Sequence, residues 1–434
     1  MSTSFIEAST PRASAFRKIN LRILAFLTVC YCIAYVDRVN VGFAKLQMQQ
    51  ELGLSDAAYG LGAGIFFLGY VLLEVPSNLL LVRIGARKTL SRIMVLWGIT
   101  TVATSMASDV TTFYILRFLL GVFEAGFAPG IIYFLTRWYP KKQMGRTMAI
   151  LMWALPIGSI AGGLASGTII EYSDGLAGLS GWQWMFILEG IPALIMGFVT
   201  FGTLCESPAE ASWLTSHEKR AVLTELGQTP PARPAHGALM RVATDLRVLL
   251  LALTYFGLIS GIYAVGFWLP TILKTAGLHS YIEIGAYSAV PYVLTIIVIY
   301  VVGRLSDRNR ERQLHAALAT AVGAVGLMAT AHFSDQFVVA LAAISIATAG
   351  TYAGYTVFWA IPADYFSEDA AAVGIAFINT LGLFGGFVSP TVIGWMKTAT
   401  GSSEVGFLAI AMLLLTSAFV LAARPARDVK VTAS

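Results

Sequence analysis

The chain has 434 residues, of which 57% are hydrophobic and only 12% are charged, and its mean hydropathy is +0.73. Soluble globular proteins carry about 25% charged residues, so this composition excludes an ordinary soluble protein. The net charge of +5 would suit a nucleic-acid partner, but the positions of the basic residues along the chain give it another meaning.

Apolar runs alternate with short polar loops along the whole chain, and each run has about the 20 residues that a helix needs to cross a bilayer. Backbone amides inside lipid must be hydrogen-bonded within their own segment, so these runs are predicted to be helices rather than strands. The predicted spans cover residues 22–44, 58–81, 90–107, 111–135, 145–171, 184–205, 247–273, 283–303, 314–332, 336–361, 371–397 and 403–423. The predicted fold is an all-α membrane protein with twelve transmembrane helices.

The longest hydrophilic stretch is rich in proline and separates the sixth span from the seventh. We therefore predict a six-helix bundle over residues 1–205, a cytoplasmic linker over residues 206–246 and a second six-helix bundle over residues 247–434. A basic turn follows the second span at residues 83–88 and the eighth at residues 304–312. Such turns at the same place in both halves indicate duplicated six-helix units, as in transporters built from inverted repeats.

The basic residues test this topology. Of the 29 Lys and Arg residues, Lys45, Lys274 and Lys397 fall in loops on one side, and Arg38 and Arg117 fall inside spans. All the others fall in loops and termini on the other side, which the positive-inside rule assigns to the cytoplasm. We predict a multi-pass protein of the inner membrane with both termini in the cytoplasm. The positive charge then reflects topology, and no nucleic-acid partner is expected.

Four charged residues lie deep in predicted spans: Asp37 and Arg38 in the first, and Arg117 and Glu124 in the fourth. Charge inside a bilayer is costly, so it is rarely kept without a function. Adjacent residues on a helix point about 100° apart, so Asp37 and Arg38 need partners other than each other. Arg117 and Glu124 share one helix face about 10 Å apart along its axis, which suits one wall of a cavity.

Two interpretations of these four residues are open. In the first, they form a structural ion-pair network between the first and fourth helices. In the second, an arginine binds a substrate carboxylate with its planar fork, and a carboxylate in a low-dielectric cavity gains and loses protons near neutral pH. Those parts describe a proton-coupled anion symporter. Two further acids, Glu74 and Glu189, are expected at a helix end and at the membrane interface.

Other polar and aromatic residues also lie at depth, although most aromatics in spans serve packing or the interface. They include Tyr35, Tyr70, Thr356, Trp359 and Asn379. Asn379 is the least ordinary, because an amide in an apolar, glycine-rich stretch needs a partner. No phosphate-binding loop or nucleophile–base arrangement is present, and none of the five His is paired within a span. No catalytic residue, metal site or enzyme activity is expected.

Four stretches then carry a family resemblance: Tyr35–Ala44, Gly69–Asn78, Arg117–Gly126 and Gly374–Asn379. They resemble the anion:cation symporter family of the major facilitator superfamily, and the resemblance covers about residues 20–423. That family includes bacterial permeases for sugar acids, tartrate, phthalate and hydroxyphenylacetate, together with sialic-acid and vesicular glutamate carriers. The resemblance implies two six-helix bundles around a central cavity.

The resemblance also implies roles for individual residues. Asp37 and Glu124 would be the proton-binding carboxylates, Arg38 would bind the substrate carboxylate, and Arg117 would tune Glu124. The residues that would line the cavity are Tyr35, Tyr70, Thr356, Trp359 and Asn379. No cofactor is expected, with protons as the coupling ion. The expected partners are a small organic carboxylate and the lipid bilayer, and the expected oligomeric state is a monomer.

The function predicted from these observations is secondary active uptake of a small organic carboxylate with protons, by alternating access. One alternative is an anion exchanger, which would need a counter-substrate inside. The other is a membrane sensor that binds a carboxylate without moving it. The substrate class stays open between a sugar acid, a tartrate-like dicarboxylate and an aromatic acid.

Overall fold

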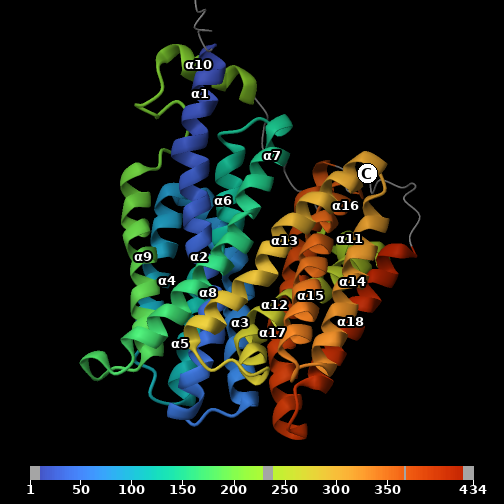
Figure 1. The fold of residues 1–434 in the computed structure, drawn as a ribbon. Coiled ribbons are helices and arrows are strands. Elements are labelled where there is room, and N and C mark those ends of the chain that lie inside the picture. Colours follow the sequence, from blue (N-terminus) through green and yellow to red (C-terminus); the bar gives the residue numbers. More distant parts are fainter. Residues whose placement is uncertain (1–9, 228–237, 366–367, 424–434) are drawn as a thin grey trace, which may run out of the picture.

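The computed structural model describes residues 10–227, 238–365 and 368–423, and the regular secondary structure in these ranges is helical throughout. The amino-terminal half, blue to green in Figure 1, and the carboxy-terminal half, yellow to red, form two bundles side by side. The predicted all-helical fold is confirmed. Four of the basic residues used to predict the topology, Arg233, Arg424, Arg427 and Lys430, lie outside the described residues.

The amino-terminal bundle begins with one long helix in three parts and continues with five further spans, two of which are broken. Its elements are α1 (Pro11–Ile19), η1 (Asn20–Leu24), α2 (Ala25–Glu51), α3 (Asp56–Ile84), α4 (Ala86–Thr104), α5 (Val110–Glu124), α6 (Phe127–Thr136), α7 (Lys141–Met152), α8 (Ala154–Ser173), η2 (Leu176–Gly178) and α9 (Gly181–Thr203).

Two short helices follow before the second bundle, and a third short helix lies between its fourth and fifth long helices. These elements are α10 (Ser216–Leu226), α11 (Ala238–Thr244), α12 (Leu246–Thr275), α13 (Tyr281–Asn309), α14 (Arg312–His332), α15 (Phe337–Phe358), α16 (Ala360–Tyr365), α17 (Glu368–Thr400) and α18 (Glu404–Ala422). The linker predicted over residues 206–246 therefore contains two helices of its own.

Eleven helical segments in the described ranges are long and apolar enough to cross a membrane. The remaining predicted span is α4, whose first two turns contain Arg87, Lys88 and Arg92, so that its apolar part is short. It packs against α9 within the amino-terminal bundle. The predicted twelve-helix architecture is confirmed.

The predicted limits of the first span, residues 22–44, are wrong. The helix begins at Pro11 and runs through the π-helical turn η1 to Glu51. Its polar first turns remain helical because Ala15, Phe16 and Ile19 are buried on one face. α1 packs against α10, and both lie at the top of Figure 1 with the start of α7. We call the end of the molecule where α1, α10 and the start of α7 lie the basic end.

A charged contact holds α1 against α10. The Lys18 ammonium and the Ser14 hydroxyl both bond to the Glu218 carboxylate, at 2.9 and 2.7 Å. Glu218 also closes a capping box with Thr215, the N-cap of α10. The Lys18 ammonium and the Thr215 backbone N–H, followed by the Ser14 hydroxyl, lower the pKa of Glu218 to about 2. These bonds tie α1, which precedes the apolar part of the first span, to α10 in the predicted linker.

The two bundles meet along three helix pairs: α2 with α12, α3 with α17, and α8 with α13. Glycine permits the closest approach in this interface. A Cβ at Gly60 of α3 would lie 2.2 Å from the Pro390 carbonyl oxygen of α17, a distance that no side chain tolerates. Gly167 of α8 lies as tightly against the Tyr281 carbonyl of α13. Small residues thus bring the halves into direct backbone contact.

A cluster that we call the Asp56 latch joins the halves at the end opposite the basic end. Asp56 lies 2.7 Å from the Lys45 ammonium of its own half and 3.4 Å from that of Lys397 on α17. Lys45 also lies 3.8 Å from the ring centre of Trp268 on α12. Lys45 was expected in a loop, but it belongs to α2 and is only 2% exposed. Asp56 and Trp268 explain this difference, since they supply the partners that a buried ammonium requires.

Candidate functional site

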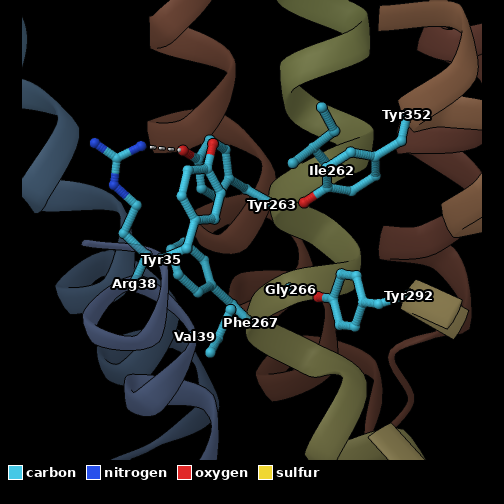
Figure 2. A pocket seen from close by; sticks show the side chains of 9 residues that line it. All are labelled: Tyr35, Arg38, Val39, Ile262, Tyr263, Gly266, Phe267, Tyr292 and Tyr352. Carbon is cyan, nitrogen blue, oxygen red and sulfur yellow. Dashed lines mark hydrogen bonds between the residues drawn. The ribbon is translucent and has the colours of Figure 1, made fainter. Parts of the chain in front are cut away.

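A cavity lies between the two halves, and Figure 2 shows its lining side chains. The lining residues are Tyr35, Arg38 and Val39 of α2, Ile262, Tyr263, Gly266 and Phe267 of α12, Tyr292 of α13 and Tyr352 of α15. Arg38 is the one charged side chain among them, and five of the others are aromatic. The cavity therefore offers a positive group within an aromatic wall.

The Arg38 guanidinium is held by both halves of the molecule. Its Nε donates to Glu124 Oε1 at 2.9 Å, and its Nη2 donates to the same oxygen. Its Nη1 donates to the Tyr263 hydroxyl of α12 at 3.2 Å, the dashed line in Figure 2. The rings of Tyr35 and Tyr70 lie 5.3 and 5.7 Å from the guanidinium carbon. Glu124 thus occupies one edge of the guanidinium, and Tyr263 contacts the Nη1 group on the other side.

The break between α5 and α6 places Glu124 in this position. Glu124 is the last residue of α5, and Gly126 adopts a left-handed φ of 87° before α6 begins. A side chain at Gly126 would be strained in that conformation and would also meet Ser77 of α3. Glu124 is fully buried, and its Oε2 has no hydrogen-bond partner among the described residues. That oxygen is the free acceptor of the pair.

Asp37 points away from Arg38, as adjacent positions on a helix require. Its carboxylate accepts hydrogen bonds from the Thr101 hydroxyl at 2.8 Å, the Trp97 indole at 3.0 Å and the Asn40 amide at 3.3 Å. Thr101 and Trp97 belong to α4, which contributes no residue to the lining of the cavity. Asp37 is not among the residues that line the cavity. The two predicted proton sites thus lie in different surroundings.

Arg117 is buried in the same half but makes different contacts. Its Nε donates to the Gly62 carbonyl oxygen at 3.4 Å, and its guanidinium lies 5.2 Å from the ring centre of Phe66. The ion pair of Glu124 is made with Arg38. The predicted influence of Arg117 on Glu124 would therefore act through the electrostatic field, and it stays a prediction.

A second group of site residues bridges the halves on α3 and α17. The Asn379 amide donates to Glu74 Oε1 at 2.8 Å and accepts from the Tyr255 hydroxyl at 3.3 Å. Trp359 meets the Tyr255 ring edge-on, with 4.8 Å between ring centres. The expectation that Glu74 anchors a helix end is wrong, because α3 continues to Ile84 and the Glu74 carboxyl is buried. The Asn379 amide is therefore hydrogen-bonded, as a polar group in an apolar stretch of helix requires.

Of the predicted site residues, the structure brings Tyr35, Arg38, Tyr70 and Glu124 together, and Asn379 and Trp359 form the second group. Thr356 is exposed and bonds to the Tyr352 carbonyl of its own helix. Tyr263 belongs to the opposite half and bonds directly to Arg38. The sequence placed it at depth in its span but did not assign it to the site. A tyrosine in an apolar span gives no signal that separates it from packing residues. Glu74 was detectable as a carboxyl within a span, and its position was misjudged.

Comparison with known proteins identifies the family of this chain. The profile of the Major Facilitator Superfamily matches residues 27–390. The chain belongs to the major facilitator superfamily. It is accordingly a membrane transporter and not an enzyme. The family resemblance found in the sequence is confirmed by this match and by the relatives described next.

Two relatives align over nearly the whole chain. A protein of Agrobacterium vitis with the name "Putative tartrate transporter" is 44% identical over 94% of this chain and 90% of its own. A "Quinolone resistance transporter" of Acinetobacter baumannii is 40% identical over 92% of each chain. The fold is similar to the crystal structure of a bacterial homologue of the human lysosomal transporter Spinster. That likeness has a TM-score of 0.75 and 17% identity, and it covers 96% of this chain and 97% of the other.

Proposed function

We propose that this transporter takes up a small organic carboxylate together with protons across the inner membrane, with the basic end in the cytoplasm. The observation that carries the proposal is the Arg38–Glu124 pair. Arg38 is the charged group that lines the cavity, and its charge is matched by a carboxylate behind it. A substrate carboxylate and Glu124 are alternative partners for the same guanidinium.

Charge balance couples the two ligands. With the cavity empty, the Arg38–Glu124 pair is neutral. With a substrate carboxylate on Arg38, the site is again neutral if Glu124 has taken up a proton. The two mixed states, with only the anion or only the proton bound, carry a net charge in a buried site, which is unfavourable. The anion and the proton are therefore expected to bind and leave together.

Inward gradients of the proton and the anion would set the direction of transport. In the proposed orientation, the Asp56 latch closes the outer side of the molecule. The bound proton and anion would then leave towards the cytoplasm, after which Glu124 recovers its bond to Arg38. A second carboxyl, Asp37, would take up and release a proton within the same half. The aromatic lining favours a substrate with a flat or apolar body, and the tartrate name of a relative favours a dicarboxylate.

Uptake into proteoliposomes tests the proposal. Radiolabelled tartrate, a sugar acid and an aromatic acid would each be offered with the lumen more alkaline than the medium. We expect accumulation of at least one of them, and its loss in Arg38→Ala. The double variant Arg38→Ala/Glu124→Gln, which leaves no unpaired charge, controls for misfolding. Uptake that requires an internal counter-substrate and ignores the pH gradient would indicate an anion exchanger, whereas binding without uptake would indicate a sensor.

A further inference from the structure

The three lysines that the sequence assigns to the outer side converge on one point of the structure. Lys45 belongs to α2, and Lys274 and Lys397 lie in the last turns of α12 and α17. Lys45 and Lys397 both pair with Asp56. Lys274 Nζ donates to the carbonyl oxygen of Leu46, the residue after Lys45, at 3.3 Å. We call Lys45, Lys274 and Lys397 the outer lysine cluster, and it lies where the two halves meet.

The cluster holds more positive charge than the described residues around it balance. Asp56 is shared by two of the lysines, and the third, Lys274, makes no ion pair in the described part of the chain. Two other acids at this end, Glu51 and Glu171, bond to residues at the starts of α9 and α13. A structural latch needs one lysine for its one acid, so the additional lysines suit an anion that comes from outside.

Trp268 of α12 adds an unpaired donor to this cluster. The ammonium groups of Lys45 and Lys397 lie 3.8 and 5.6 Å from its ring centre. The indole is fully buried, and its Nε1 has no hydrogen-bond partner among the described residues. Lys274 is exposed, and the Lys397 side chain is 25% exposed. The cluster therefore extends from the surface to a buried group that lacks an acceptor.

The cluster lies directly outward of the cavity on two helices. Lys45 follows Arg38 by seven residues on α2, so the two share a helix face about 10 Å apart along its axis. On α12, Trp268 follows Phe267, which lines the cavity. Between these levels, a Cβ at Gly42 would lie 3.1 Å from the Phe267 carbonyl oxygen. The cluster and the cavity are thus successive cationic positions on one wall, separated by a tight contact of α2 with α12.

We propose that the outer lysine cluster is an entry site for a carboxylate anion, which is attracted by Lys274 and replaces Asp56 as the partner of Lys397 and Lys45. One carboxylate is exchanged for another, so the lysines keep an anionic partner. Asp56 is the first residue of α3 and is partly exposed, so water and the helix N-terminus stabilise its released carboxylate. Loss of the Asp56–Lys397 pair removes an ion pair between the halves, and their separation at this end brings the anion to Arg38.

This inference rests on the proposed carboxylate substrate and orientation, but its first test measures binding without transport. Tartrate serves as the probe, and Arg38→Ala/Glu124→Gln removes the charged pair of the cavity. We expect tartrate to change the tryptophan fluorescence of this variant in a saturable way, because the bound anion draws the ammonium groups away from Trp268. Adding Trp268→Phe should abolish the change. No saturable change, an equal change without Trp268, or an equal change with chloride would overturn the proposal.

The second test uses uptake into proteoliposomes of a carboxylate that the wild type accumulates, at concentrations below half-saturation. Lys274 is the lysine to replace, because it is not part of the Asp56 latch. We expect Lys274→Gln to lower the initial rate about threefold in low salt and to match the wild type in high salt, since salt screens the attraction.

Lys219→Gln is the matched control. The Lys219 ammonium also donates to a backbone carbonyl, that of Ala209, but it lies on α10 at the basic end, so its replacement should leave the rate unchanged at both salt concentrations. No loss in Lys274→Gln, or a loss that persists in high salt, would refute the entry site. If the wild type accumulates no carboxylate, the proposed function fails, and the binding test alone then decides the entry site.

Discussion

Replacing Glu124 by glutamine gives the sharpest prediction for the Arg38–Glu124 pair. Two N–H groups of Arg38 converge on Glu124 Oε1, and the pair is buried. Hydrogen bonds to charged groups contribute about 1.5–3 kcal/mol, and an amide oxygen in the same place is a much weaker acceptor. A substrate carboxylate would then no longer have to displace an anion. If about 2–3 kcal/mol of that competition is removed, binding tightens by about 30- to 150-fold.

The assay is substrate binding to the purified protein over a range of pH, by calorimetry or by tryptophan fluorescence. The wild type should bind more weakly as the pH rises, because the ionised Glu124 reclaims Arg38, whereas Glu124→Gln should bind tightly and without that dependence. The variant should exchange substrate across the membrane but lose accumulation driven by a pH gradient. If Glu124→Gln bound as weakly as the wild type at high pH with the same slope, the competition between substrate and Glu124 would be refuted.

Two further predictions concern the ends of the molecule. Asp56→Asn removes the anion shared by two lysines, so the halves should separate more readily at that end. Spin labels attached at Met106→Cys and Val338→Cys, both exposed at that end, should then show longer distances between the labels. An unchanged distribution of these distances would argue against the latch. At the basic end the folded-state pKa of Glu218 lies at about 2, below its ordinary value, because of the Lys18 ammonium. The stabilisation is therefore present at neutral pH and lost as the pH falls from about 4.5 towards 2. The thermal unfolding midpoint should differ between the wild type and Glu218→Gln at neutral pH and converge in acid, and a constant difference would contradict this assignment.

Much of the fold could be predicted from the sequence, because few backbone structures can cross a bilayer. The length of the apolar runs, together with the need for backbone hydrogen bonds within each run, predicted the twelve helices. The basic residues predicted which loops lie on the same side of the membrane. The limits of the first helix did not follow. Hydropathy ends that span before Lys45, whereas the helix continues because Asp56 and Trp268 lie where Lys45 needs partners. Those partners come from other helices, and no local pattern records them.

The site shows the same division between local and tertiary information. Charged residues within spans identified Arg38 and Glu124, and helix geometry correctly separated Asp37 from Arg38. The interpretation of an ion-pair network between the first and fourth helices allowed for a pair of this kind, and Arg38 and Glu124 form one. Helix geometry could not predict which residues pair, since that depends on the break at Gly126. Glu189 was misjudged because neighbouring glycine and proline residues suggested the membrane interface, while its burial follows from how α9 packs against α4 and α2.

Proton movement during substrate entry tests the central claim most directly. Proteoliposomes in a lightly buffered medium would receive an outward-to-inward gradient of a transported carboxylate, with no imposed pH gradient. If anion and proton bind together at Arg38 and Glu124, the medium should become more alkaline as the substrate enters, and Glu124→Gln should abolish that change while substrate still exchanges. Entry of the carboxylate into wild-type vesicles with no change in external pH would contradict the account.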